Sequence, residues 1–178
     1  ARVVIDSDRN ADALLDKINH HTTRTLARQQ AMAGDLRAIL AAARIGPHLE
    51  RIGDYAKNMA KRTGRLGTPL DAELAAQFRW MGSRIQSMLD RVMLAYRNHD
   101  AAMANVAWAD DAELDALYAR LFEHLFNHMH ADKQHIADGI QLMFIAKGLE
   151  RADDHVTDIA EEIYLMRSEE HTSELQSL

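Results

Sequence analysis

The residues best suited to chemistry form an acidic pattern that occurs twice in the chain. LERIGDYAKNMA begins at residue 49 and LERADDHVTDIA begins at residue 149. On a helix, residues four apart share a face, so each copy predicts a stripe of oxygen ligands. The stripes are Glu50, Asp54 and Asn58 in the first copy, and Glu150, Asp154 and Asp158 in the second. Such hard ligands suit Mg²⁺, Mn²⁺, Ca²⁺ or iron.

A solvated helix face is the simpler explanation of these acidic residues. Like charges four residues apart, however, destabilise a helix by about 0.2–0.5 kcal/mol, and the unfavourable spacing recurs upstream of each motif. The upstream pairs are Asp8 with Asp12, and Asp111 with Asp115. If the helices that carry them lie beside the motif helices, four carboxylates converge, and we predict a cation site in each copy. Arg51 and Arg151 leave open the alternative that simple ion pairs neutralise the charge.

The elements that would position these residues are helices. The chain of 178 residues contains 47% hydrophobic residues but only 2 prolines and 8 glycines, a composition typical of helical proteins. Apolar residues recur at helical spacing in five segments, at about 2–30, 35–64, 70–98, 101–130 and 132–166. Gly46-Pro47 interrupts the second segment. We expect a kink there, with two shorter helices as the alternative.

The order of these helices indicates an internal repeat. The second and fifth helices match at an offset of 100, and DRNADAL at residue 8 matches DAELDAL at residue 111. The counterpart of the third helix would then precede residue 1. The predicted fold is all-α, a tandem repeat of three-helix bundles in which the first bundle is truncated. Residues 1–67 would form the incomplete repeat and 68–166 the complete one. We expect partly exposed apolar stripes and self-association in the first repeat.

Composition excludes several classes of protein. The net charge of −6 argues against a nucleic-acid binder, and the lack of cysteine argues against a disulfide framework or a thiolate metal site. No apolar run approaches the roughly 18 residues of a membrane span, and no signal peptide opens the chain. A cytoplasmic protein is expected. The tail RSEEHTSELQSL, residues 167–178, is polar, lacks the helical apolar period and resembles a translated sequencing adapter. We expect it to be non-native.

The sequence also argues against an enzyme. A di-iron carboxylate enzyme needs Glu-x-x-His on inward-facing helices. The residues three positions after Glu50, Glu123 and Glu150 are Gly53, Phe126 and Asp153. No phosphate-binding loop or nucleophile motif is present. His124 and His128 share a helix face, but a role at the surface or bundle edge is favoured over metal binding. A metal-dependent carboxylate enzyme is the least favoured alternative, after a metal-independent helical interaction module.

Together, the two acidic motifs inside a duplicated helical unit resemble the PhoU family of bacterial phosphate-signalling proteins. The family pattern is Glu/Asp-x-x-x-Asp, carried twice and often written E-R-I-G-D-x-x-x-N. The similarity covers essentially residues 1–166 and includes GDLRAILAAARI before the first motif. The second motif departs from the pattern, with Ala152-Asp153 in place of Ile-Gly and Asp158 in place of Asn. The extra charge would strengthen metal binding there.

The resemblance implies a non-enzymatic, cytoplasmic negative regulator of phosphate uptake and of the phosphate regulon. Such a protein would link the phosphate ABC transporter to its sensor histidine kinase, touch the membrane only through these partners, and form a homodimer. The acidic motifs would hold a metal cluster, iron or zinc by resemblance, with magnesium or manganese also suited. The ligands carried over are Glu50, Asp54 and Asn58, then Glu150, Asp154 and Asp158, with Asp8, Asp12, Asp111 and Asp115 from the neighbouring helices.

Overall fold

The computed structural model describes residues 2–28 and 33–176, with side chains in these ranges apart from residues 8–9, 28, 33–35, 105–112 and 167–176. Five long helices and one short 3₁₀ turn account for nearly all of it, and the described ranges contain no strand. The elements are α1 (Arg2–Arg28), α2 (Ala33–Thr63), α3 (Ala72–Asn98), α4 (Ala101–Ala131), η1 (Lys133–His135) and α5 (Ile136–Gln176). The prediction of an all-α fold is confirmed.

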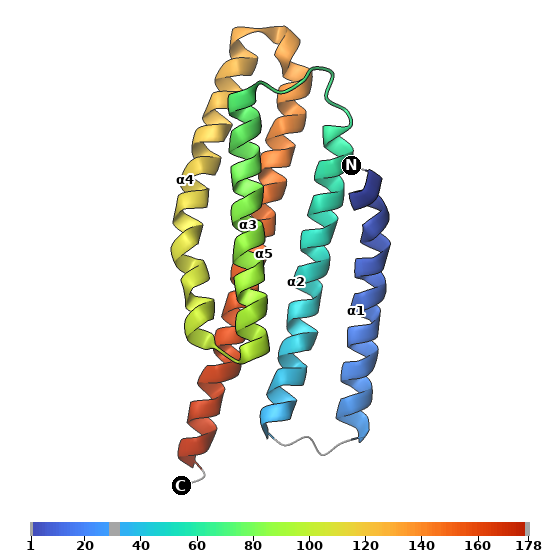
Figure 1. Cartoon of the computed structure of the whole chain (residues 1–178), viewed down its shortest axis with the longest axis vertical. Helices are drawn as coiled ribbons and strands as arrows, with labels where there is room; N and C mark the ends of the chain where they lie inside the picture. Colours follow the sequence, from blue (N-terminus) through green and yellow to red (C-terminus); the bar gives the residue numbers. More distant parts are fainter. Residues whose placement is uncertain (1, 29–32, 177–178) are drawn as a thin grey trace.

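The helices run roughly alongside one another, and α5 connects the two halves (Figure 1). It packs against α3 and α4 on one side and against α2 on the other, while α1 contacts only α2 among the described elements. The arrangement is a three-helix bundle, α3–α4–α5, with the α1–α2 hairpin leaning on α5. Since α2 and α5 carry the two acidic motifs, the motifs lie on the two helices at the contact between the repeats.

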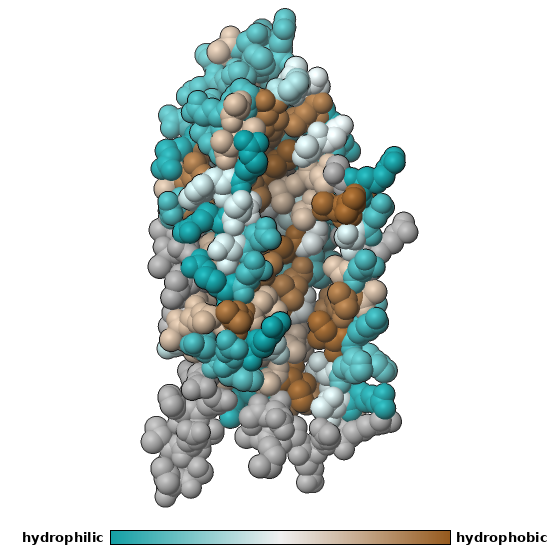
Figure 2. All heavy atoms as spheres, viewed as in Figure 1, coloured by the Kyte–Doolittle hydropathy of each residue, from teal (hydrophilic) through white to brown (hydrophobic). Residues whose placement is uncertain are grey.

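The core lies mainly in the α3–α4–α5 bundle. Met81 and Met88 of α3, Leu121 of α4 and Ile159 of α5 are almost completely buried. Among the described residues, helix α2 adds only Ala41 and Ile45 to the buried apolar side chains, and α1 adds none. Large apolar side chains of the hairpin are exposed instead: Val3, Val4, Leu14, Leu26, Leu36 and Leu40. Their exposure confirms the predicted exposed apolar stripes of the first repeat, and Figure 2 shows apolar patches among the polar ones on this face of the molecule.

Short connections fix the helix ends. The carboxylates of Asp71 and Asp100 accept hydrogen bonds from backbone amides in the first turns of α3 and α4, at 2.8 and 3.0 Å. Between these helices His99 takes the left-handed conformation with φ 53°, which lets the chain reverse in a two-residue turn. Such tight connections require α3, α4 and α5 to be antiparallel neighbours.

The sequence left open whether Gly46-Pro47 divides the second helix. Helix α2 passes through Pro47 without a break, so the expectation of one helix rather than two is confirmed. Gly46 stands where α1 comes close, because a Cβ at this position would lie 2.9 Å from Cδ1 of Leu15.

Helix α5 continues to Gln176, through most of the polar tail, where we expected the helical pattern to be lost. No glycine or proline follows Gly148 to end it. The non-native origin of the tail stays a prediction.

No helix of the described residues is both long and apolar enough to cross a bilayer.

Candidate metal-binding sites

The first motif places three carboxylates from two helices near one another. Glu50 and Asp54 lie one turn apart on α2, with 22% and 29% of their side chains exposed. Asp12 of α1 lies close enough to act on Glu50 electrostatically. Burial raises the pKa of Glu50, Asp54 raises it further, Arg51 opposes the rise, and Asp12 adds to it. This mutual repulsion is what a bound cation would relieve.

A lysine already occupies part of this surface. Lys57 Nζ lies 2.6 Å from Oδ1 of Asp54, and this hydrogen bond lowers the pKa of Asp54 more than burial raises it. Arg51 lies further away, at 3.8 Å from Glu50 and 3.9 Å from Asp54. The ion pairs expected from the arginines are therefore weaker than one made by a lysine that the sequence interpretation did not consider.

The second motif also has a lysine as counter-ion, but this lysine precedes the motif glutamate in the sequence, whereas Lys57 follows the motif aspartate. Lys147 Nζ lies 2.6 Å from the Glu150 carboxylate, and Arg151 Nη1 lies 4.0 Å from Asp154 Oδ2. Asp154 and Asp115 are largely solvent-exposed. The side chains of the remaining upstream residues, Asp8 and Asp111, lie outside the described residues.

Asp153 behaves differently from the acidic residues around it. Only 2% of this residue is exposed, and it is the one buried charged residue in the part of the chain with described side chains. Its repeat counterpart Gly53 faces α1, because a Cβ there would lie 3.7 Å from the Cβ of Ala11. The extra charge that Asp153 adds to the second motif is therefore held inside the helix packing, whereas that of Asp158 stays partly exposed. A buried carboxylate is costly unless it is paired or neutralised.

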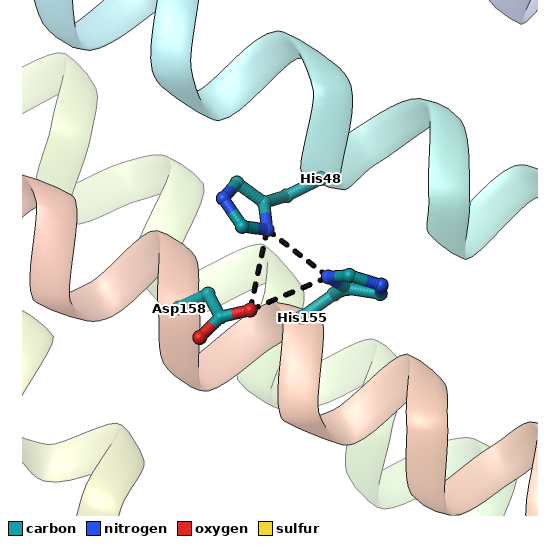
Figure 3. A group of neighbouring side chains, drawn as sticks. All are labelled: His48, His155 and Asp158. Atoms are coloured by element: carbon teal, nitrogen blue, oxygen red, sulfur yellow. Dashed lines mark hydrogen bonds and ion pairs between the residues drawn. The ribbon is translucent and has the colours of Figure 1, made fainter.

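The third motif positions, Asn58 and Asp158, lie at the contact between α2 and α5. Asn58 lines an open cleft with Tyr55, Arg62 and Lys147. Asp158 lies instead against two histidines, with its Oδ2 3.3 Å from Nδ1 of His48 and 3.4 Å from Nδ1 of His155 (Figure 3). The sequence interpretation missed both histidines. The available signal was their spacing, since each stands within five residues of a motif glutamate.

The histidines on α4 are exposed, as expected for residues at the bundle edge. His128 stacks on His135 with ring centroids 4.1 Å apart, and His135 lies 3.9 Å from Asp132. No described contact joins His124 or His128 to either acidic motif.

The donor sets fit a hard cation. The carboxylate oxygens of the first motif are the ligand type that Mg²⁺, Mn²⁺ or iron takes, but in this arrangement Asp12, Glu50 and Asp54 do not bring three oxygens within 4.8 Å of one another. At the same time, Lys57 and Lys147 show that protein ammonium groups already serve as counter-ions to both motifs. The geometry thus supports two interpretations, a metal site and a charged surface balanced by lysine.

Comparison with known proteins places this arrangement in a family. A family model described as "PhoU domain" matches residues 1–63 and 78–163, which include both motifs. A phosphate-specific transport system accessory protein PhoU homolog from Xylella fastidiosa (strain 9a5c) is 40% identical over 168 residues, which is 94% of this chain and 71% of that protein. A homolog of the same name from Caulobacter vibrioides is 38% identical over 181 residues, which is 100% of this chain and 78% of its own.

Two solved structures share the fold. PhoU from Pseudomonas aeruginosa superposes with a TM-score of 0.85 at 28% identity, over 93% of this chain and 79% of that one. The phosphate transport system regulatory protein PhoU from Streptococcus pneumoniae gives 0.82 at 27% identity, over 93% and 77%. With both the sequence and the helix arrangement in agreement, the chain belongs to the PhoU domain family.

Proposed function

We propose that this chain is an accessory and regulatory protein of phosphate transport. The observation that carries the proposal is the extent of the likeness: relatives named as phosphate-specific transport system accessory proteins match nearly the whole chain, at up to 40% identity. The helix arrangement of a PhoU structure matches as well.

In more detail, the chain lowers expression of phosphate-starvation genes by linking a phosphate ABC transporter to a sensor histidine kinase. It acts in the cytoplasm by contact and without catalysing a reaction. The α2–α5 contact is suited to this role, because it joins the two repeats and carries charged side chains from both. Exposed apolar residues on α1, among them Val3 and Leu14, support self-association into a homodimer.

The acidic motifs bind cations in this proposal. Asp12, Glu50 and Asp54 would hold the ion of the first repeat, and Glu150 and Asp154 that of the second. The expected further ligands are Asp8, Asn58, Asp111 and Asp115; Asp158, predicted with them, lies against His48 and His155 instead. A bound iron, zinc, magnesium or manganese ion would supply positive charge. The chain's own carboxylates would orient it and present it on the surface to a partner.

Gene replacement tests the regulatory role. In a bacterium whose own accessory protein has been deleted, a phosphate-starvation reporter is active even when phosphate is plentiful. Expression of this chain should return the reporter to its repressed level. A reporter that stays fully active, although the chain is folded and abundant, would overturn the proposal.

A metal-independent interaction module is the second candidate, and the lysine contacts favour it. Lys57 and Lys147 balance the motifs without any metal. The two candidates differ in one measurement on the same variant. Asp54→Asn should abolish binding of Mn²⁺ to the first repeat and repression together if the metal is required. If repression is lost although the first repeat of the unmodified chain binds no Mn²⁺, the acidic surface acts directly.

A further inference from the structure

Three side chains from the two repeats meet within the α2–α5 contact, between the Arg44–Glu162 ion pair and the cleft that Asn58 lines. His48 comes from α2, and His155 and Asp158 come from successive turns of α5 (Figure 3). The two Nδ1 atoms lie 3.0 Å apart, and Oδ2 of Asp158 lies 3.3 and 3.4 Å from them. The histidine side chains are 25% and 22% exposed, and the aspartate is 47% exposed. The group is thus held by packing but open to solvent on one side.

The shape of this triangle is that of a metal site. Zinc binds histidine nitrogen and carboxylate oxygen at about 2.0–2.2 Å in tetrahedral geometry, so two ligands of one ion lie about 3.3–3.6 Å apart. The three observed separations, 3.0, 3.3 and 3.4 Å, lie close to that edge length. In the part of the chain with described side chains, no other trio of histidine and acidic residues brings its ligand atoms together in this way.

The way the two rings face each other is compatible with a bound metal. Two Nδ1 atoms that face each other at 3.0 Å have room for one proton between them, so only one of the rings can donate. The neutral imidazole is the form that binds metals, and a metal that takes both lone pairs would displace the shared proton.

The internal repeat supplies a comparison within the same molecule. At the offset of 100 that relates α2 to α5, His48 corresponds to Gly148, His155 to Tyr55 and Asp158 to Asn58. Those three residues line the open cleft further along the same contact. The two places are therefore related by the repeat, but only one carries a full set of ligating side chains. Packing between the repeats alone does not require a His–His–Asp trio.

We propose that His48, His155 and Asp158 form a binding site for a divalent transition metal of the zinc class, held between the two repeats. The site differs from the acidic motifs in chemistry, because its two nitrogen donors favour zinc, cobalt or nickel over magnesium. It leaves a fourth position on the exposed side for water. Because ligands come from both α2 and α5, bound metal clamps the hairpin onto the bundle.

Cobalt titration tests the site, because Co²⁺ in a nitrogen-containing site of low coordination number gives visible absorption that carboxylate and water ligands alone give only weakly. The metal-free full chain should develop this absorption up to about one Co²⁺ per chain, and Zn²⁺ should displace it with release of protons. His48→Gln and His155→Gln should each lose the absorption. His124→Gln, a change at an exposed histidine on α4, should keep it.

A further variant separates this site from the acidic motif of the first repeat. Glu50→Gln combined with Asp54→Asn should keep the cobalt spectrum, whatever happens to binding of Mn²⁺. Zn²⁺ should also raise the melting temperature of the unmodified chain but not of His48→Gln, since a ligand that binds only the folded state stabilises it. Circular dichroism establishes that each variant is folded. A spectrum retained in both histidine variants, or absent from the folded unmodified chain, overturns the proposal.

Discussion

The carboxylate of Asp138, in the first turn of α5, accepts a hydrogen bond of 2.6 Å from the hydroxyl of Thr68 in the α2–α3 connection. The backbone amides of Gly67 and Thr68 donate two more, at 2.9 and 3.0 Å. One side chain of α5 therefore holds the segment by which the chain passes from the hairpin to the bundle. These hydrogen bonds, from Gly67 first, lower the pKa of Asp138.

Removal of the Asp138 carboxylate should make the stability of the folded chain depend less on pH in the acidic range. A depressed pKa contributes stability above the ordinary aspartate value, and the contribution disappears as the pH falls through the lowered value. Asp138→Asn should therefore melt at a lower temperature than the unmodified chain at pH 7. The difference should shrink below about pH 4. Asp90→Asn, at an exposed position of α3, should leave the melting temperature unchanged at both pH values. An Asp138 effect that is constant with pH would contradict the assignment.

Tyr96 joins α3 to α2, because its hydroxyl donates a hydrogen bond of 3.2 Å to the carbonyl oxygen of Ala38. Tyr96→Phe should lower the free energy of unfolding by about 0.5–1.5 kcal/mol. Burial raises the pKa of Tyr96, so its contribution is complete below the ordinary tyrosine value and declines as the pH rises towards the raised one. Urea unfolding measures the loss. Tyr118→Phe, which removes a hydroxyl with no described hydrogen bond, is the control.

The helices and the repeat could be predicted because their signals are local. Apolar spacing, the two prolines and the duplicated motif are all visible within short stretches of sequence. Even so, periodicity placed the end of α5 near Met166, whereas the helix runs to Gln176 because no residue there breaks it. Polar composition on its own does not end a helix.

The site was harder to predict because its geometry depends on packing between distant helices. His48 and His155 are 107 residues apart, and only the antiparallel α2–α5 contact brings them together. The sequence suggested the arginine that follows each motif glutamate as the counter-ion of the motif. The lysines at three-residue spacing, Lys57 and Lys147, make the shorter contacts. Which of several nearby cations pairs with a carboxylate depends on rotamers, and a helical wheel does not determine them.

The exposed hairpin and the buried core should respond differently to the same substitution. Leu121 is 1% exposed and Leu14 is 57% exposed. Leu121→Ala should cost about 2–5 kcal/mol of unfolding free energy, because it leaves a cavity in the core. Leu14→Ala should cost less than about 0.5 kcal/mol and should reduce self-association, as measured by sedimentation velocity. Equal costs at the two positions in a sample dilute enough to be monomeric would contradict the exposure of Leu14.

Two glycines within helices should also respond differently to the same substitution by alanine. A Cβ at Gly82 of α3 would meet nothing within 4 Å, whereas one at Gly46 of α2 would lie 2.9 Å from Leu15. Gly82→Ala should stabilise the chain by about 0.5–1 kcal/mol, because alanine loses less backbone entropy in a helix. Gly46→Ala should gain less, or lose stability, since Leu15 must move. Thermal unfolding ranks the two variants, and a larger gain at Gly46 would contradict the close α1–α2 approach.

The contact between Lys57 and Asp54 decides between the two interpretations of the first motif. If the carboxylates bind a cation, the lysine competes with it at 2.6 Å. A partly buried ion pair of this kind is worth about 0.4–1 kcal/mol, so Lys57→Met should tighten Mn²⁺ binding about two- to fivefold. The electron paramagnetic resonance signal of free Mn²⁺ measures the change. Lys61→Met, at an exposed position one turn further along α2, should have no effect. If instead the lysine is the motif's own counter-ion, Lys57→Met leaves the chain without Mn²⁺ and lowers its stability, because Glu50 and Asp54 then repel each other unopposed.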